Sequence, residues 1–175
     1  MPYRIPQTMV AALVALAGSS TALAQTVQAD LHGYQEVPVV STAATGSLKA
    51  KIDADAGMIH WELTYEGLQG TVAQAHIHLG QTSVNGGIAV WLCTTPAITA
   101  PAGTQICPGA SGTLSGTIMA SNVVGPPAGQ PQPQQLLAGE FDELVAAIRA
   151  GVTYANIHSS ISPGGEIRGQ IRHQH

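Results

Sequence analysis

Histidine is the residue type in this sequence best suited to chemistry, and three of the seven histidines occur in related patterns. His76 and His78 are two residues apart in a run that alternates between apolar and polar residues, so both side chains project from the same face of a strand. His158 ends the segment A-N-I-H, which repeats the A-x-I-H pattern that contains the first pair. If the two strands are neighbours, the three imidazoles form a ligand set for copper or zinc, with Glu166 or water as a further ligand.

A second interpretation of the same histidines is structural. H-x-H is a short pattern, and strand histidines often hydrogen-bond only the backbone of a loop. His60 has the same parity as Glu62 on another predicted strand, so it either supports the ligands through a hydrogen bond or is simply exposed. The sequence contains no H-E-x-x-H, no G-x-S-x-G, no phosphate-binding glycine loop and no convincing acid pair. We therefore expect no catalytic residues and favour a binding module over an enzyme.

The elements that would position these histidines are short strands, because the dominant hydrophobic period is two. In residues 58–65, one face carries Ile59, Trp61, Leu63 and Tyr65. Further β-prone runs lie at 26–32, 46–52, 72–79, 87–92, 112–119, 152–158 and 166–172. Clusters of Gly, Asn, Asp and Pro separate them as turn signals. Seven or eight such strands predict a mainly β fold, an antiparallel sandwich or barrel.

One segment departs from the period of two. Apolar residues recur at helical spacing, at Phe141, Leu144, Val145 and Ile148. Acidic residues precede them, Arg149 lies in the last turn and a glycine follows, which predicts one short helix near 140–150. The Pro/Gln/Gly-rich segment 125–135 cannot pair in the interior of a sheet, so we expect an extended connection there.

The first 24 residues have the three-part pattern of a secretory signal peptide. Arg4 supplies the positive charge, residues 9–17 are apolar, and Ala22-Leu23-Ala24 is a cleavage site of the A-x-A type. The apolar run is too short to span about 30 Å of hydrocarbon. We therefore expect residues 25–175 to form a single periplasmic or secreted domain, with no membrane span after cleavage.

The two cysteines agree with export. Cys93 and Cys107 both lie beyond the predicted cleavage site, and an even number of cysteines in an exported chain predicts one disulfide. The alternative, a pair of thiolate metal ligands, needs closer spacing or further cysteines, and the sequence has none.

Charge and composition exclude some classes of partner and of chain. The 175 residues include 6 Lys+Arg and 10 Asp+Glu, a net charge of −4, and 9% charged residues compared with 45% hydrophobic ones. Binding to a phosphate backbone needs a basic patch, so we expect no nucleic-acid partner. The hydrophobic fraction is too high for a disordered chain. A protein partner stays open.

Several motifs resemble the CHRD (chordin-type) domain family, in the family's order. They are 31–38 (LHGYQEVP), 63–68 (LTYEGL), 75–80 (AHIHLG), 85–87 (NGG), 148–151 (IRAG), 154–158 (YANIH) and 163–170 (PGGEIRGQ). The resemblance covers about residues 26–172. It implies a mostly β, extracytoplasmic domain of the kind found alone in bacteria and repeated in chordin, and it supplies no established activity. The growth-factor binding of chordin is not carried over on fold analogy.

The resemblance also bears on the histidines, because both A-x-I-H segments lie inside these motifs. Ile77 and Ile157 already supply the inward faces of the two strands, so packing does not require imidazoles beside them. One implied arrangement is a metal site joining the strands, with His60, Asn156 and Arg168 as hydrogen-bonding neighbours. In the other, Glu166 and Arg168 pair across the strands while the histidines bond to loop carbonyls.

Three functions from different classes follow. The first is an exported binding module of no established activity that holds copper or zinc through strand histidines. The second is a metal-free adhesive or protein-interaction domain. The third is a dismutase-like metalloenzyme, which would need a metal-bridging imidazole and a carboxylate ligand that the sequence does not identify.

Overall fold

The computed structural model describes residues 25–126 and 134–174. The predicted signal peptide and most of the Pro/Gln/Gly-rich segment lie outside these ranges. The described strands are β1 (Gln25–His32), β2 (Thr45–Asp53), β3 (Met58–Glu66), β4 (Val72–Leu79), β5 (Gly87–Cys93), β6 (Gly112–Ile118), β7 (Thr153–Ser159), β8 (Ile167–Gln170) and β9 (Arg172–His173). The helices are α1 (Phe141–Arg149) and the 3₁₀ turns η1 (Gly33–Gln35) and η2 (Ala120–Asn122).

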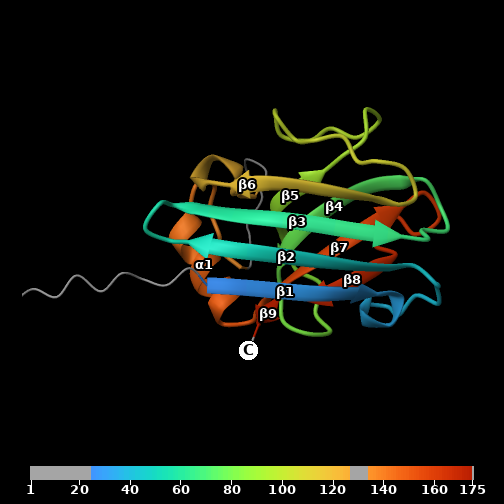
Figure 1. Cartoon of the computed structure of the whole chain (residues 1–175), viewed down its shortest axis with the longest axis horizontal. Helices are drawn as coiled ribbons and strands as arrows, with labels where there is room; N and C mark the ends of the chain where they lie inside the picture. Colours follow the sequence, from blue (N-terminus) through green and yellow to red (C-terminus); the bar gives the residue numbers. More distant parts are fainter. Residues whose placement is uncertain (1–24, 127–133, 175) are drawn as a thin grey trace, which may run out of the picture.

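All nine strands belong to one sheet in the order β5-β4-β7-β8-β1-β2-β3-β6, with β9 also paired to β1. The named pairings are antiparallel. Figure 1 shows β1, β2, β3 and β6 side by side in one layer, with β4, β7 and β8 crossing behind them. The sheet curls into a nearly closed barrel, so the prediction of a mainly β, antiparallel fold with one short helix is confirmed.

The strands form where apolar and polar residues alternate, because this pattern buries one face of each strand and exposes the other. On β3 the side chains of Ile59, Trp61, Leu63 and Tyr65 are buried, and the residues between them are exposed. A fully buried side chain of this kind contributes about 1.5–3 kcal/mol relative to an exposed one. The inward faces of β1 and β2 follow the same rule and fill the interior of the barrel.

The predicted helix is present as α1, which lies at the end of the barrel where β1 begins (Figure 1). Its buried residues are Phe141, Leu144, Val145 and Ile148. Gly151 follows in the left-handed conformation at φ +68°, which a glycine adopts without strain. None of the helices in the described part of the chain has the length and hydrophobicity to cross a membrane.

One predicted strand is divided. Residues 166–172 form β8 and β9, because β8 pairs with β7 and, at one position, with β1, whereas β9 pairs with β1 alone. Ile171 is buried between them, so the apolar alternation continues across the break and hides it in the sequence. The disulfide between Cys93 and Cys107 is formed as predicted. It closes the loop that follows β5.

Strands β4, β7 and β8 differ from β3 because they are buried on both faces. Every residue of β7 and β8 is buried, and so are four consecutive residues of β4. Most of their inward residues are apolar, as predicted for Ile77 and Ile157. Their outward residues are polar and nevertheless covered.

Candidate metal centre

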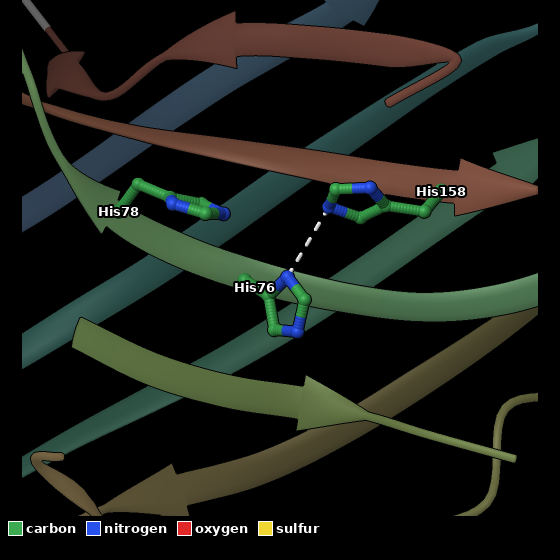
Figure 2. Close-up of side chains that lie close together, drawn as sticks. All are labelled: His76, His78 and His158. Atoms are coloured by element: carbon green, nitrogen blue, oxygen red, sulfur yellow. Dashed lines mark hydrogen bonds between the residues drawn. The ribbon is translucent and has the colours of Figure 1, made fainter. Parts of the chain in front are cut away.

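The pairing of β4 with β7 brings the predicted histidines together. His76 lies directly opposite Asn156, and His158 follows two residues later on the same face. Figure 2 shows the rings of His76, His78 and His158 around one point between the two strands. Each of the three residues offers one ring nitrogen, and these atoms all lie within 4.8 Å of one another. Two metal–nitrogen bonds of about 2.1 Å span at most about 4.2 Å, so the more distant nitrogens must move closer together to share an ion.

Hydrogen bonds to backbone carbonyls fix the proton positions on two of the rings. His78 Nδ1 lies 2.9 Å from the carbonyl oxygen of Gly86, and His158 Nδ1 lies 2.9 Å from that of Pro163. Because a carbonyl can only accept, both Nδ1 atoms carry the hydrogen. In a neutral imidazole the Nε2 atom then bears the lone pair. Metal-binding histidines are commonly oriented in this way.

His76 completes the cluster from the neighbouring position on β4. Its Nδ1 lies 3.2 Å from His158 Nε2 (Figure 2). The Nε2 atoms of His76 and His78 are buried and have no hydrogen-bond partner among the described residues. Buried polar atoms normally have a hydrogen-bond partner, so these two ring nitrogens need a physical explanation. A bound ion would supply one for His78.

Burial keeps all three rings neutral at neutral pH. It lowers the pKa of His76 to about 2, and the neighbouring histidines lower it further. Burial also lowers the pKa of His78 to about 4, although the hydrogen bond to Gly86 opposes the shift. The pKa of His158 is lowered by burial too, with the Pro163 carbonyl opposing. Neutral imidazole is the form that binds metals.

Aromatic rings enclose the cluster. The ring of Trp91 on β5 meets His76 edge to face at a centroid distance of 4.3 Å. Tyr154 stacks on His78 with centroids 4.8 Å apart and planes 2° from parallel. These contacts hold two of the three imidazoles in place.

Arg168 lies above Tyr154 and ties down the loop between β4 and β5. Its guanidinium carbon lies 3.4 Å from the centroid of the tyrosine ring. Its nitrogens donate to the carbonyl oxygens of Gln81 and Val84 at 3.0 Å and to Asn85 Oδ1 at 3.2 Å. Arg168 is therefore part of the cover over the site, and it makes no ion pair with Glu166.

Glu36 is a member of this region that the sequence did not identify as a site residue. It lies in the connection between β1 and β2 and is 4% exposed. Burial raises its pKa to about 7, although Arg168, the Val37 amide and the Asn156 side chain all lower it. The only signal in the sequence is an acidic residue inside the motif E-V-P. No spacing rule relates it to a strand more than a hundred residues away.

Two predicted site residues lie outside the cluster. The Glu166 Oε1 atom accepts hydrogen bonds from Thr42 Oγ1 at 2.9 Å and from the Gln69 amide at 2.8 Å. His60 is exposed on the outer face of β3, where its Nδ1 lies 3.1 Å from Thr117 Oγ1. Asn156, in contrast, lies within the cluster, with its Oδ1 3.1 Å from His158 Nε2.

Comparison with known proteins gives one match. The model of the CHRD domain family aligns with residues 27–171, from β1 to the residue after β8. No curated protein and no solved structure matches the chain significantly.

Proposed function

The chain belongs to the CHRD domain family, and we propose that it is an exported, non-enzymatic binding module that holds one copper or zinc ion through His76, His78 and His158. The observation that carries this proposal is the convergence of three buried, neutral imidazoles on one point. Copper and zinc are among the metals that imidazole ligands suit.

One of the distances already matches that between two ligands of a shared ion. With bonds of about 2.0–2.1 Å, two ligand atoms on a tetrahedral ion lie about 3.3 Å apart. His76 Nδ1 and His158 Nε2 are separated by 3.2 Å. The backbone carbonyls that hold His78 and His158 leave the Nε2 atoms of both rings available as ligands.

Binding is better supported than catalysis. The cluster in the described residues consists of three histidines and no carboxylate. A dismutase-like centre would need a carboxylate ligand and an imidazole shared between two metals. Substrate would also need access, whereas His76 is completely buried and the other two rings are nearly so.

Export is part of the proposal. The signal-peptide pattern of residues 1–24 and the Cys93–Cys107 disulfide support an oxidising, extracytoplasmic location. The mature chain is expected to begin at Gln25. Intact-mass analysis of the exported protein tests this, and retention of residues 1–24 would contradict it.

Equilibrium dialysis tests the ion. The mature protein, stripped with a chelator and re-oxidised, is dialysed against Zn²⁺ and, separately, Cu²⁺. We expect one tightly held ion per chain, and a double variant, His76→Ala with His158→Ala, that holds none. Wild-type protein that retains no more ion than the double variant would refute the metal-binding proposal.

A metal-free interaction domain is the second candidate, and one surface favours it. Tyr34 and Val39 are 73% and 69% exposed. With Pro38, they border a groove of about 340 Å³. If dialysis detects no ion, binding through this groove becomes the better function. Substitution of Tyr34 and Val39 by serine should then abolish partner binding without changing stability.

A further inference from the structure

We infer that Asn156 supplies the fourth ligand through its side-chain carbonyl oxygen, so that a divalent ion is held in a closed set of three imidazole nitrogens and one amide oxygen. This inference rests on the proposed function and names a ligand beyond the three histidines. It follows from a local symmetry of the two strands, from the contacts of the Asn156 amide and from its surroundings.

The symmetry lies in the two A-x-I-H segments. They pair antiparallel, with Ala75 opposite Ile157 and Ile77 opposite Ala155. A two-fold rotation between the strands therefore exchanges the segments. It relates His78 to His158 and His76 to Asn156, which lie directly opposite each other. Three of these four equivalent positions carry histidine, and the fourth carries an amide.

The supporting hydrogen bonds repeat the same symmetry. His78 donates to the carbonyl of Gly86, which belongs to the Gly-Gly turn after β4. His158 donates to the carbonyl of Pro163, which precedes the Gly-Gly turn after β7. Each half of the site thus consists of a ligand at the strand end, a carbonyl that orients it, and a residue two positions earlier that faces the same point.

The contact between Asn156 and His158 favours a cation at this point. Asn156 Oδ1 lies 3.1 Å from His158 Nε2. Because His158 carries its hydrogen on Nδ1, both of these atoms are acceptors and repel each other. Asn156 is 3% exposed, so water does not screen the repulsion. Two ligands of one tetrahedral ion are expected at about this separation, and the ion would convert the repulsion into attraction.

Glu36 explains why the amide oxygen faces the histidines. The Asn156 side chain lowers the pKa of Glu36 against the larger effect of burial, as an N–H group directed at the carboxyl does. With its nitrogen directed toward Glu36, the amide presents its oxygen to the other side, beside His158 and His78. Turning the amide over would place two acceptors together at Glu36. Glu36 is therefore a positioning residue.

The donor set defines the kind of ion. An amide oxygen is a harder ligand than the thiolates and thioethers that select Cu⁺, so three imidazoles with one such oxygen favour Zn²⁺ or Cu²⁺. Four protein ligands also fill a tetrahedral site. Structural zinc sites are closed in this way, whereas catalytic ones keep a position for water or substrate.

Cobalt spectroscopy tests the closed site, with Co²⁺ as a visible stand-in for Zn²⁺. The stripped, disulfide-bonded mature protein is loaded with Co²⁺, and its visible absorption is recorded before and after azide is added. We expect an intense tetrahedral spectrum that azide leaves unchanged. A wild-type spectrum that azide alters would overturn the inference while leaving the three-histidine site intact. Wild-type protein that takes up no Co²⁺ would overturn the inference together with the proposed function.

Substitutions identify the ligand. Asn156→Leu keeps the size and removes the oxygen, so affinity should fall about ten- to a hundredfold and the spectrum should become sensitive to azide. Asn156→Asp keeps an oxygen ligand and should restore tight binding and azide insensitivity. Gln170→Leu is the matched control because Gln170 is a buried amide on the same outer face, bonded to Gly80 and Gly151. It should bind like wild type. Equal affinities for Asn156→Leu and Gln170→Leu would overturn the inference, and the Asn156→Asp and wild-type azide measurements decide it if the leucine variant does not fold.

Discussion

The outer faces of β3 and β4 carry polar residues in the same alternating pattern, in opposite environments. On β3, His60 and Glu62 project into solvent between buried apolar neighbours. On β4, His76 and His78 also lie between apolar residues, and both are buried. Two strands of one sheet thus place histidine on the same side of the barrel wall, exposed to solvent on β3 and buried on β4.

The difference comes from what covers each strand. The loop between β4 and β5 lies over the outer face of β4, β7 and β8 and is held by Arg168. The connection between β1 and β2 supplies Glu36 to the same region. β3 has no comparable cover over His60 among the described residues, since His60 is exposed. Alternation therefore determines which way a side chain points, and the loops determine whether it is buried.

Removing Arg168, which holds the loop between β4 and β5 over the histidine cluster, should have the largest effect on stability. Arg168→Leu leaves the carbonyls of Gln81 and Val84 and the side-chain oxygen of Asn85 without their donor, and each buried acceptor left unpaired typically costs about 1–3 kcal/mol in the free energy of unfolding. Arg172→Leu removes an exposed arginine that reaches Thr82 of the same loop, and should cost less than about 0.5 kcal/mol. Urea denaturation of both variants measures the difference. Equal losses would mean that the cover does not depend on Arg168.

Removing the disulfide should destabilise the fold and spare the site. Cys93 and Cys107 are 14 residues apart and outside the cover. Cys93→Ser with Cys107→Ser should lower the free energy of unfolding by about 3 kcal/mol, the value for a loop of about 15 residues. Calorimetry measures this loss, and dialysis should still detect one ion per chain. Loss of the ion from this variant would show that the metal site is not where we propose it.

Matched histidine variants compare the two faces directly. His78→Ala removes a buried ligand and should weaken Zn²⁺ binding at least about a hundredfold, more than the loss of a supporting residue around the ligands. His60→Ala removes an exposed imidazole and should leave binding unchanged. Isothermal titration with Zn²⁺ measures both affinities. Equal weakening by the two substitutions would show that the ion binds surface histidines non-specifically.

The smallest expected effect is that of pH on the free energy of unfolding of the metal-free protein. The folded state keeps His76, His78 and His158 neutral, while the unfolded chain protonates them below their usual pKa of 6.5. The unfolded state then binds more protons, so stability is greatest above that pH and falls as the pH decreases toward 4 for His78 and lower for His76.

Glu36 opposes this trend because its raised pKa of about 7 makes the folded state bind a proton there. His76 and His78 against Glu36 leave a net loss of roughly 1 kcal/mol between about pH 6.5 and 5.5, and the lowered pKa of His158 adds to this loss. Urea denaturation at the two pH values measures it, with the His78→Ala variant expected to lose less. Constant stability over this range would show that the imidazoles are not held neutral.

Local patterns predicted most of the fold. The alternation in 72–79 gave the bounds of β4, and the spacing of four apolar residues gave α1, because both depend on residues that are close in sequence. The break at Ile171 was not predictable, because it marks a change of partner strand while the alternation continues.

The site was predictable to the extent that it is local. Parity placed His76 and His78 on one face, and the repeated A-x-I-H pattern related His158 to them. Glu36 approaches Asn156 only through the closure of the barrel, over 120 residues of chain. Glu166 has the expected parity, yet Thr42 and Gln69 hold its carboxylate elsewhere. Those contacts depend on loops whose paths no periodicity describes.

Elemental analysis of the native protein tests the central claim most directly. The protein is purified under non-denaturing conditions, without added metal or chelator, from the cell that makes it. The account predicts about one equivalent of zinc or copper per chain, lost from His78→Ala and retained by His60→Ala. Native wild-type protein that is free of both metals, and that takes up neither on later incubation, would contradict it.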